Sequence, residues 1–349
     1  MSWQNCVERP VPPGNKVEAE KIRKFLARFG LSFDAAVDYT VGFYRNDELV
    51  AVGSRAGEVL RNIAVEPALQ GEGLTAAVLS HLIQEAARRG IYHYFIYTKP
   101  DTAPLFCALG FKEIARAEPY AVLLESGLGS IADHCKMLAA KVADLPPGPR
   151  AALVVNCNPF TLGHRAVIER AARENASVVV LVVEEDRSLF PFADRLRLVK
   201  EGVADLANVR VLPGGQYVIS AATFPAYFTR GEEITKAQTR LDAEVFGKHI
   251  APALGATRRY VGSEPYCAVT ASYNEAMKTV LPEYGVEVVV MPRVEVDSAS
   301  VSASRVRELI RLDDWDAIAR LVPETTCRYL RSPENSALIE RIKASQSRH

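Results

Sequence analysis

The chain has 349 residues, and its 42 Lys and Arg are balanced by 42 Asp and Glu. This length exceeds one ordinary core and favours two domains of roughly 100 to 200 residues each. The even charge argues against a nucleic-acid or membrane-surface protein and favours a small molecule or a protein as partner. No signal-peptide pattern opens the chain, no apolar run could span a bilayer, and the six cysteines form no C-x-x-C pair. The expected location is the cytoplasm.

The first part of the chain predicts a helix followed by a small sheet. Apolar residues recur at helical spacing over 16–31, and three Val- and Tyr-rich runs over 35–67 predict strands arranged as a meander. The stretch LQGEGLTAAVLSHLIQEAARRG, 69–90, predicts a Gly-rich turn and an amphipathic helix. The run 91–98 is a buried strand, and two further strand candidates lie before residue 126.

The Gly-rich turn places backbone N–H groups at the positive end of a helix, where they could meet a pyrophosphate. A tight turn without a ligand is the alternative. Residues 15–125 resemble the GNAT family of N-acetyltransferases, in which the amides of this turn hold the pyrophosphate of coenzyme A. Gln70 and Gly73 match the family signature, whereas Thr75 replaces its final small residue. The resemblance therefore implies binding of a CoA-like arm by Gln70, Gly71, Gly73 and Thr75, rather than ordinary acetyl-CoA-dependent transfer.

A Pro- and Gly-rich segment before residue 150 is the best boundary candidate, which gives domains 1–145 and 146–349. Five β-rich runs follow, separated by helical stretches, and this alternation is typical of a parallel sheet covered by helices. They are AALVVNCN, ASVVVLVVEE, VRVLPGG, RRYVGSE and VEVVVMPR. The expected fold class is therefore α/β, with a GNAT-like α+β domain before a Rossmann-like parallel-sheet domain.

The stretch NCNPFTLGHR, 156–165, connects the first of these strands to a helix. Pro159 cannot continue a sheet ladder, Gly163 lets backbone approach a ligand closely, and His164 begins the helix. An imidazole and free amides are thus expected at the carboxyl edge of the sheet, where open α/β sheets bind ligands. A surface histidine that caps a loop is the alternative. Cys157 has apolar neighbours and no identifiable base, so a buried thiol is favoured over a nucleophile.

Far downstream, VSASRVRELI, 301–310, places two hydroxyls before a helix that carries an arginine. Together with T-x-G-H, this motif resembles the HxGH nucleotidyltransferase superfamily, with Thr161 in place of the leading His. The resemblance implies adenylyl transfer from ATP, with Thr161, His164 and Arg307 as the catalytic residues. The remaining ATP-binding residues would be Asn158, Pro159, Phe160, Gly163, Arg195, Ser302 and Ser304. For Arg195, an ordinary position on a solvated helix face is an equally good interpretation.

Longer phrases make the resemblance more specific. NCNPFTLGHRAVIE, ISAATFPAYF at 219–228, FGKHIAPALG, RRYVGSEPYCAVTASYNEAM and VSASRVREL resemble the citrate lyase ligase family, over nearly the whole chain. The family implies an acid–thiol ligase that activates acetate with ATP. It acetylates the thiol of the CoA-like prosthetic group on the acyl-carrier subunit of citrate lyase, through acetyl-adenylate, and releases AMP and pyrophosphate. Mg²⁺ is expected with ATP, whereas no tightly bound cofactor and no protein metal site are expected.

Two other functions stay open. One is a different adenylyltransferase, which forms a dinucleotide or cofactor and carries a regulatory acetyltransferase-like domain. The other is a carrier-binding or acetyl-CoA-sensing module without turnover. Glu264 and Tyr273 are candidates for the adenine or acetate pocket, with structural roles equally favoured. The sequence does not decide between citrate lyase, citramalate lyase and malonate decarboxylase as the source of the carrier, nor does it give the oligomeric state.

Overall fold

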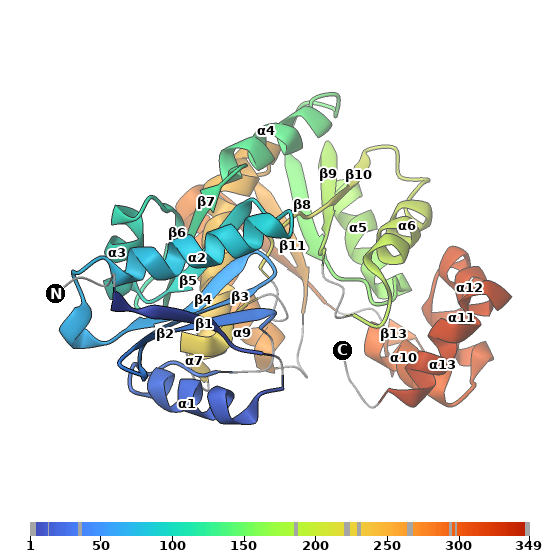
Figure 1. Cartoon of the computed structure of the whole chain (residues 1–349). Coiled ribbons are helices and arrows are strands. Elements are labelled where there is room, and N and C mark those ends of the chain that lie inside the picture. Colours follow the sequence, from blue (N-terminus) through green and yellow to red (C-terminus); the bar gives the residue numbers. More distant parts are fainter. Residues whose placement is uncertain are drawn as a thin grey trace. The chain divides into compact units, whose positions relative to one another are not determined.

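The computed structural model describes residues 5–12, 14–33, 37–184, 188–219, 224–228, 232–263, 268–292, 295–296 and 299–345. The chain divides into two compact units (Figure 1). Unit 1 contains Met1–Ser130 and Pro225–Ala237, and unit 2 contains Ile131–Phe224 and Gln238–His349. No helix in the described part of the chain is both long and apolar enough to cross a membrane.

Unit 1 is built on a mixed seven-stranded sheet with the order β1-β2-β3-β4-β5-β7-β6. Neighbouring strands are antiparallel except β4 and β5, which are parallel and pair only at Val59 and Phe95. The expected meander is confirmed as β2, β3 and β4, whereas the short edge strand β1 was not predicted. The strands are β1 (Val7–Pro10), β2 (Tyr39–Arg45), β3 (Glu48–Ala56), β4 (Val59–Val65), β5 (His93–Thr98), β6 (Lys112–Ala117) and β7 (Ala121–Gly127).

Helices cover both faces of this sheet. On one face, α1 buries Ile22 and Leu26 against Val52 of β3. On the opposite face, α2 packs Val78 and Leu82 over the sheet, so closely that a Cβ on Gly53 would lie 2.4 Å from Val78. The helices of unit 1 are α1 (Lys16–Ala27), α2 (Leu74–Arg88) and α3 (Ala103–Ala108), with short 3-10 turns η2 (Pro67–Leu69), η3 (Pro100–Thr102) and η4 (Ala226–Phe228).

Unit 2 contains the predicted parallel sheet, with the order β10-β9-β8-β11-β12. All four neighbouring pairs are parallel, so the expected α/β class is confirmed. From β8 the chain adds β9 and β10 on one side of the sheet and then β11 and β12 on the other, so the strand order reverses between β8 and β11. These two central strands pair only near their beginnings. The strands are β8 (Arg150–Val155), β9 (Ser177–Val182), β10 (Val209–Pro213), β11 (Arg258–Gly262) and β12 (Glu287–Met291), and a separate hairpin joins β13 (Glu295–Val296) to β14 (Ala299–Ser300).

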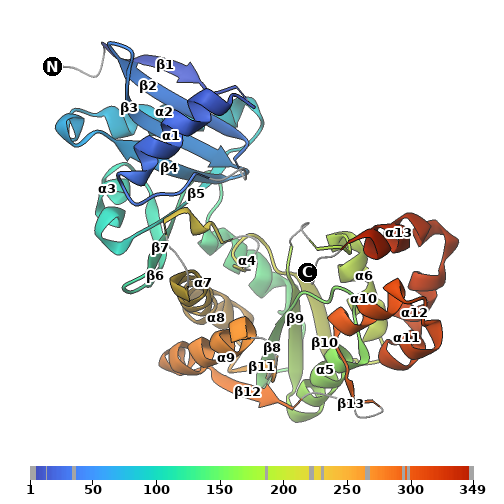
Figure 2. The same cartoon turned by 90° about the horizontal axis from the view of Figure 1, so that it is seen from below.

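On one face of the unit 2 sheet, α5, α6 and the C-terminal helices share the main core, and α4, α8 and α9 lie on the other side (Figure 2). The first group is α5 (Leu162–Glu174), α6 (Phe192–Gly202), α10 (Ala303–Arg311), α11 (Trp315–Leu321), α12 (Glu324–Arg331) and α13 (Ser336–Ala344). The second group is α4 (Ile131–Lys141), α8 (Ala251–Leu254) and α9 (Ala268–Val280), and unit 2 also has a π-helical turn η5 (Phe246–Ile250) and 3-10 turns η6 (Leu281–Tyr284) and η7 (Pro333–Asn335). Helix α7 (Glu232–Val245) begins in unit 1 and continues into unit 2 from Gln238.

The helix before the Pro-rich segment belongs to unit 2. Cys135 donates its thiol hydrogen to the His249 carbonyl at 3.3 Å, and Arg210 donates to the Lys141 carbonyl at 2.7 Å. The division of units therefore falls at Ser130, ahead of the boundary expected near residue 145. Residues 225–237, which the sequence analysis assigned to the second domain, lie in unit 1.

Candidate functional site

The site begins at the carboxyl end of β8, where the chain turns into α5. Thr161 caps α5: its Oγ1 accepts from the backbone N–H of His164 at 3.4 Å. In return, the backbone N–H of Thr161 donates to Nδ1 of His164 at 3.1 Å, and Thr161 Oγ1 lies 2.9 Å from the same nitrogen. This is a capping box, a reciprocal bond pair that satisfies two otherwise orphaned donors. Thr161 is only 1% exposed, so the cap is buried.

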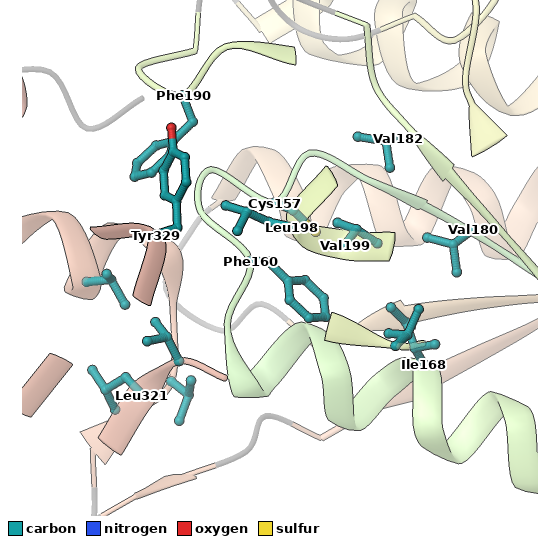
Figure 3. Close-up of a cluster of buried hydrophobic side chains, with 14 of the residues drawn as sticks. Cys157, Phe160, Ile168, Val180, Val182, Phe190, Leu198, Val199, Leu321 and Tyr329 are labelled. Carbon is teal, nitrogen blue, oxygen red and sulfur yellow. The ribbon is translucent and has the colours of Figure 1, made fainter. Parts of the chain in front are cut away.

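This cap fixes the tautomer of His164. A backbone N–H can only donate, so Nδ1 must accept, and the neutral imidazole carries its proton on Nε2. The ring also stacks on Phe160, with centroids 6.0 Å apart and planes inclined by 17°. Phe160 is fully buried and packs near Leu198 and Val199 (Figure 3). Phe160, predicted as an ATP-binding residue, therefore lies in the core, where it supports the histidine.

Gly163 brings the two sequence motifs together. A Cβ on Gly163 would lie 3.0 Å from the carbonyl oxygen of Val301, the first residue of the second motif. The close neighbour of Gly163 is therefore the protein's own backbone, whereas the sequence analysis expected a ligand there. It sets the N-terminus of α5 beside that of α10, which Ser302 caps by accepting from the Arg305 N–H at 3.2 Å. Ser304 Oγ lies 3.1 Å from Ser302 Oγ. Two positive helix ends and two hydroxyls meet here, an arrangement suited to phosphate.

Arg307 connects α10 to the loop that follows β8. It is 4% exposed, and its guanidinium donates to the carbonyl of Asn158. Burial, and secondarily the charge of Arg311, lowers the pKa of Arg307 to about 10, so it stays protonated at neutral pH. Asn158 is itself buried and accepts from the Phe190 N–H at 3.1 Å through Oδ1. Asn158 and the buried Pro159 thus join the end of β8 to α10 and to the segment before α6.

Arg195 does not lie on the solvated helix face that was the alternative interpretation. Its side chain is fully buried, and its guanidinium donates to the carbonyls of Phe190, Asn156 and Val183 at 2.8–3.0 Å. It also donates to Oδ1 of Asn156 at 2.7 Å. These bonds tie the ends of β8 and β9 to the start of α6. The contacts support a role in positioning the loops around the site rather than in holding a phosphate.

Cys157 is buried in the same loop. It is 1% exposed, and burial raises the pKa of its thiol well above the ordinary value. Because the thiolate is the reactive form, this environment suppresses nucleophilic chemistry. We expect iodoacetamide to leave Cys157 unmodified in the folded protein while it alkylates the exposed Cys107. Peptide mapping by mass spectrometry checks this, and rapid labelling of Cys157 would reopen the nucleophile hypothesis.

A buried charged cluster on β11 was not predicted. Arg259 and Asp242 are 1% and 3% exposed, with Nη2 and Oδ2 3.5 Å apart. Tyr273 bridges them: its hydroxyl donates to Asp242 and accepts from Arg259 at 3.0 Å. Burial raises the pKa of the Tyr273 phenol, and the Arg259 guanidinium lies 4.2 Å from the Phe246 ring centroid. The sequence signal was an arginine within the run RRYVG, because a charged side chain in a buried strand needs charge or hydrogen-bond partners.

The cluster holds residues at the carboxyl edge of the sheet. Asp242 Oδ1 accepts from the Ile219 N–H at 2.9 Å, and β8 and β11 stop pairing immediately after Ala152 and Arg259. The separation lies at the point where the strand order reverses, which is where open α/β sheets bind ligands. Tyr273, a candidate for the adenine or acetate pocket, has its hydroxyl in this buried network. Glu264, the other candidate, lies outside the described residues.

Replacement of Asp242 by Asn tests this cluster. The change leaves the Arg259 charge buried without its counterion, and we expect a loss of about 3–5 kcal/mol in unfolding free energy. Urea unfolding of the full-length protein, followed by circular dichroism, measures the loss. The double variant Asp242→Asn/Arg259→Met removes both charges and should recover most of the stability. Equal losses in the single and double variants would contradict the ion pair.

The predicted arm-binding turn of unit 1 lies between β4 and α2. Gly71 and Gly73 have φ of +85° and +84°, which any residue with a side chain adopts only under strain. Gly73 is the N-cap of α2 and supplies no side chain to the helix terminus. Gln70 donates through Nε2 to the Val65 carbonyl at 3.2 Å, and Thr75 is partly exposed in the first turn of α2. The backbone amides at this terminus are therefore not capped by a side chain.

Known proteins match both parts of the chain. The family model of the citrate lyase ligase C-terminal domain matches residues 150–330. A citrate (pro-3S)-lyase ligase from Klebsiella pneumoniae is 40% identical over 322 residues, which cover 90% of this chain and 93% of the relative. The chain belongs to the citrate lyase ligase family.

Two more distant similarities accompany the family match. A phosphopantetheine adenylyltransferase from Methylococcus capsulatus is 36% identical over 67 residues, which cover 19% of this chain and 41% of that protein. An acetyl-CoA-bound GNAT family acetyltransferase from Elizabethkingia anophelis aligns structurally with a TM-score of 0.28 and 16% identity, over 36% of this chain and 99% of that protein. The family membership confirms the predicted ligase over the two alternatives, the dinucleotide- or cofactor-forming adenylyltransferase and the module without turnover.

Proposed function

We propose that unit 2 activates acetate as acetyl-adenylate with ATP, and that the acetyl group then passes to the thiol of the CoA-like arm on the citrate lyase acyl carrier. Family membership supports the overall reaction. The observation that carries the assignment to this site is the junction of α5 and α10, where Gly163 meets Val301 beside a histidine of fixed tautomer. Two helix N-termini and an Nε2–H donor fit the phosphates of ATP.

The residues act by binding and orienting charge. His164 donates from Nε2 to an α-phosphate oxygen, and the hydroxyls of Ser302 and Ser304 with the α10 amides hold the departing pyrophosphate. Arg307 contributes a positive charge at the junction. Acetate is ionised at neutral pH, since carboxyl groups have reference pKa values near 4, so its attack requires no general base. Mg²⁺ would bind mainly to the ATP phosphates, because it prefers phosphate and water oxygens as ligands.

Acetate-dependent ATP–pyrophosphate exchange, without carrier, tests this function because it isolates adenylate formation from thiol transfer. We expect exchange with acetate and none without it. If exchange fails both without and with added carrier, the adenylate route is wrong. Unit 1 is proposed to receive the carrier arm at Gly71 and Gly73, and a soluble dephospho-CoA should then bind the full chain.

A further inference from the structure

A piece of chain from the middle of the sequence is built into unit 1. The segment Pro225–Ala237 belongs to unit 1, although the residues on both sides of it belong to unit 2. We call this piece the inserted segment. Tyr227 and Phe228 near its start are 6% and 4% exposed, and their rings make an edge-on contact with centroids 5.1 Å apart. Unit 1 is therefore completed by residues whose sequence neighbours fold with unit 2.

Tyr227 anchors the inserted segment through its backbone and its side chain. Its carbonyl accepts from the Ser32 N–H at 2.8 Å and from Ser32 Oγ at 3.3 Å. Its hydroxyl donates to the carbonyl of Tyr97, and the Arg61 guanidinium lies 4.8 Å from the centroid of its ring. Burial raises the pKa of this phenol, so it keeps its proton for the bond to Tyr97. Three separate stretches of unit 1 thus hold one residue.

A second anchor lies in unit 2 and joins the chain on the two sides of the inserted segment. The Ile219 N–H donates to Asp242 Oδ1 at 2.9 Å, and the two residues are 2% and 3% exposed. Asp242 also accepts from the Tyr273 hydroxyl and pairs with Arg259, so it is held firmly in the buried cluster of unit 2. The Ile219–Asp242 bond therefore closes the base of a loop that contains the inserted segment.

Helix α7 links the two anchors along the chain. Only three residues separate Phe228 from its start at Glu232, and Asp242 lies in its last turn, which ends at Val245. Its sequence, EEITKAQTRLDAEV, contains neither proline nor glycine, the residues at which helices usually kink. A helix of 14 residues is about 20 Å long and moves largely as one piece. A displacement at its start is therefore passed on to Asp242.

We propose that the inserted segment couples the two units, so that docking of Tyr227 in unit 1 and the Ile219–Asp242 bond in unit 2 stabilise each other. Each anchor orders part of the same loop. The second anchor then forms with a smaller loss of conformational entropy when the first is in place. Coupling between two sites is reciprocal, so removal of either anchor weakens the other by the same factor.

The coupling gives unit 1 an influence on the carboxyl edge of the unit 2 sheet. Asp242 is the counterion of Arg259, and β8 and β11 last pair at Ala152 and Arg259, where the strand order reverses. We expect Tyr227→Ala to lower acetate-dependent ATP–pyrophosphate exchange by less than His164→Ala does, because Tyr227 acts only through position. This consequence for activity rests on the proposed function.

Hydrogen–deuterium exchange of two backbone amides in the full-length protein tests the coupling. The Ile219 amide reports on the base of the loop and the Ser32 amide on the docking of Tyr227. We expect Tyr227→Ala to speed exchange at Ile219 about tenfold, within the usual range of coupling between sites. In the reverse direction, Asp242→Ala/Arg259→Met removes the acceptor of Ile219 without leaving an unpaired arginine, and should speed exchange at Ser32 by a similar factor.

Leu82→Ala is the matched control. Leu82 is fully buried where α2 packs on the sheet, so its truncation leaves a cavity and lowers the stability of unit 1. The bonds of Tyr227 stay in place in this variant. Exchange at Ile219 should therefore remain as slow as in the wild type.

Wild-type protection of Ile219 in a folded Tyr227→Ala variant would overturn the inference, and so would equal increases in Tyr227→Ala and Leu82→Ala. If Tyr227→Ala does not fold, the reverse measurement decides, because the double variant keeps Tyr227: unchanged protection of Ser32 would then contradict the coupling. Neither measurement depends on catalysis. A failure of the proposed function would appear only in the ATP–pyrophosphate exchange and would leave the coupling intact.

Discussion

His164→Ala is expected to lower acetate-dependent ATP–pyrophosphate exchange by about 10²–10³-fold, the usual cost of removing one preorganised donor from a transition state. The imidazole is the side chain whose donor nitrogen is fixed by the structure, because Thr161 N–H occupies Nδ1. Exchange of radiolabelled pyrophosphate into ATP measures the loss. Because the ring is held at a helix terminus and not in the core, the variant should remain folded.

His164→Gln is the matched control for this prediction. Glutamine at the third position of a helix forms the same capping box, since its side-chain oxygen accepts from the N-cap N–H. The unfolding free energy should therefore stay within about 0.5 kcal/mol of the wild type, while exchange falls as far as in the alanine variant. Substantial exchange by His164→Gln would remove the imidazole from the mechanism and leave the cap as its function.

The sequence predicted the parts of the site that depend on local chain geometry. A strand, a turn with Pro159 and Gly163, and a helix that begins at a capping threonine are all neighbours in sequence, and the parallel sheet followed from the spacing of apolar runs. The second motif was also predictable, because Ser302 caps its helix in the ordinary way. Gly163 was predicted to let backbone approach a ligand closely. In the structure its close neighbour is the backbone of Val301, which is distant in sequence.

Long-range packing accounts for what could not be predicted. Arg195 was predicted either to bind ATP or to lie on a solvated helix face, and nothing in its local sequence shows that three carbonyls from separate segments converge on it. The same holds for Asp242 and Arg259, which are distant in sequence and meet only when α7 packs near β11. The position of residues 225–237 in unit 1 likewise depends on tertiary packing, because the neighbouring sequence predicts continuation of the second domain.

The close approach of Gly163 to Val301 leads to the second large expected effect. A Cβ at Gly163 lies 3.0 Å from a backbone oxygen, which cannot rotate away, so Gly163→Ala should move α10 by a few tenths of an ångström. Gly163→Val adds a larger, branched side chain and should displace α10 further. A misplacement of about 1 Å in a catalytic constellation costs about 10²-fold in rate, so we expect graded losses of exchange, smaller for alanine and about 10²-fold for valine.

The two substitutions separate geometry from stability. Alanine has a higher helix propensity than glycine, so Gly163→Ala should not lower the stability of α5 itself, and any loss of exchange then reflects the displaced junction. If the site works by joining the two helix termini around the ATP phosphates, the KM for ATP should rise in the same order as exchange falls. Unchanged exchange in a folded Gly163→Val variant would contradict the junction as the phosphate site, because α10 would then have moved without consequence.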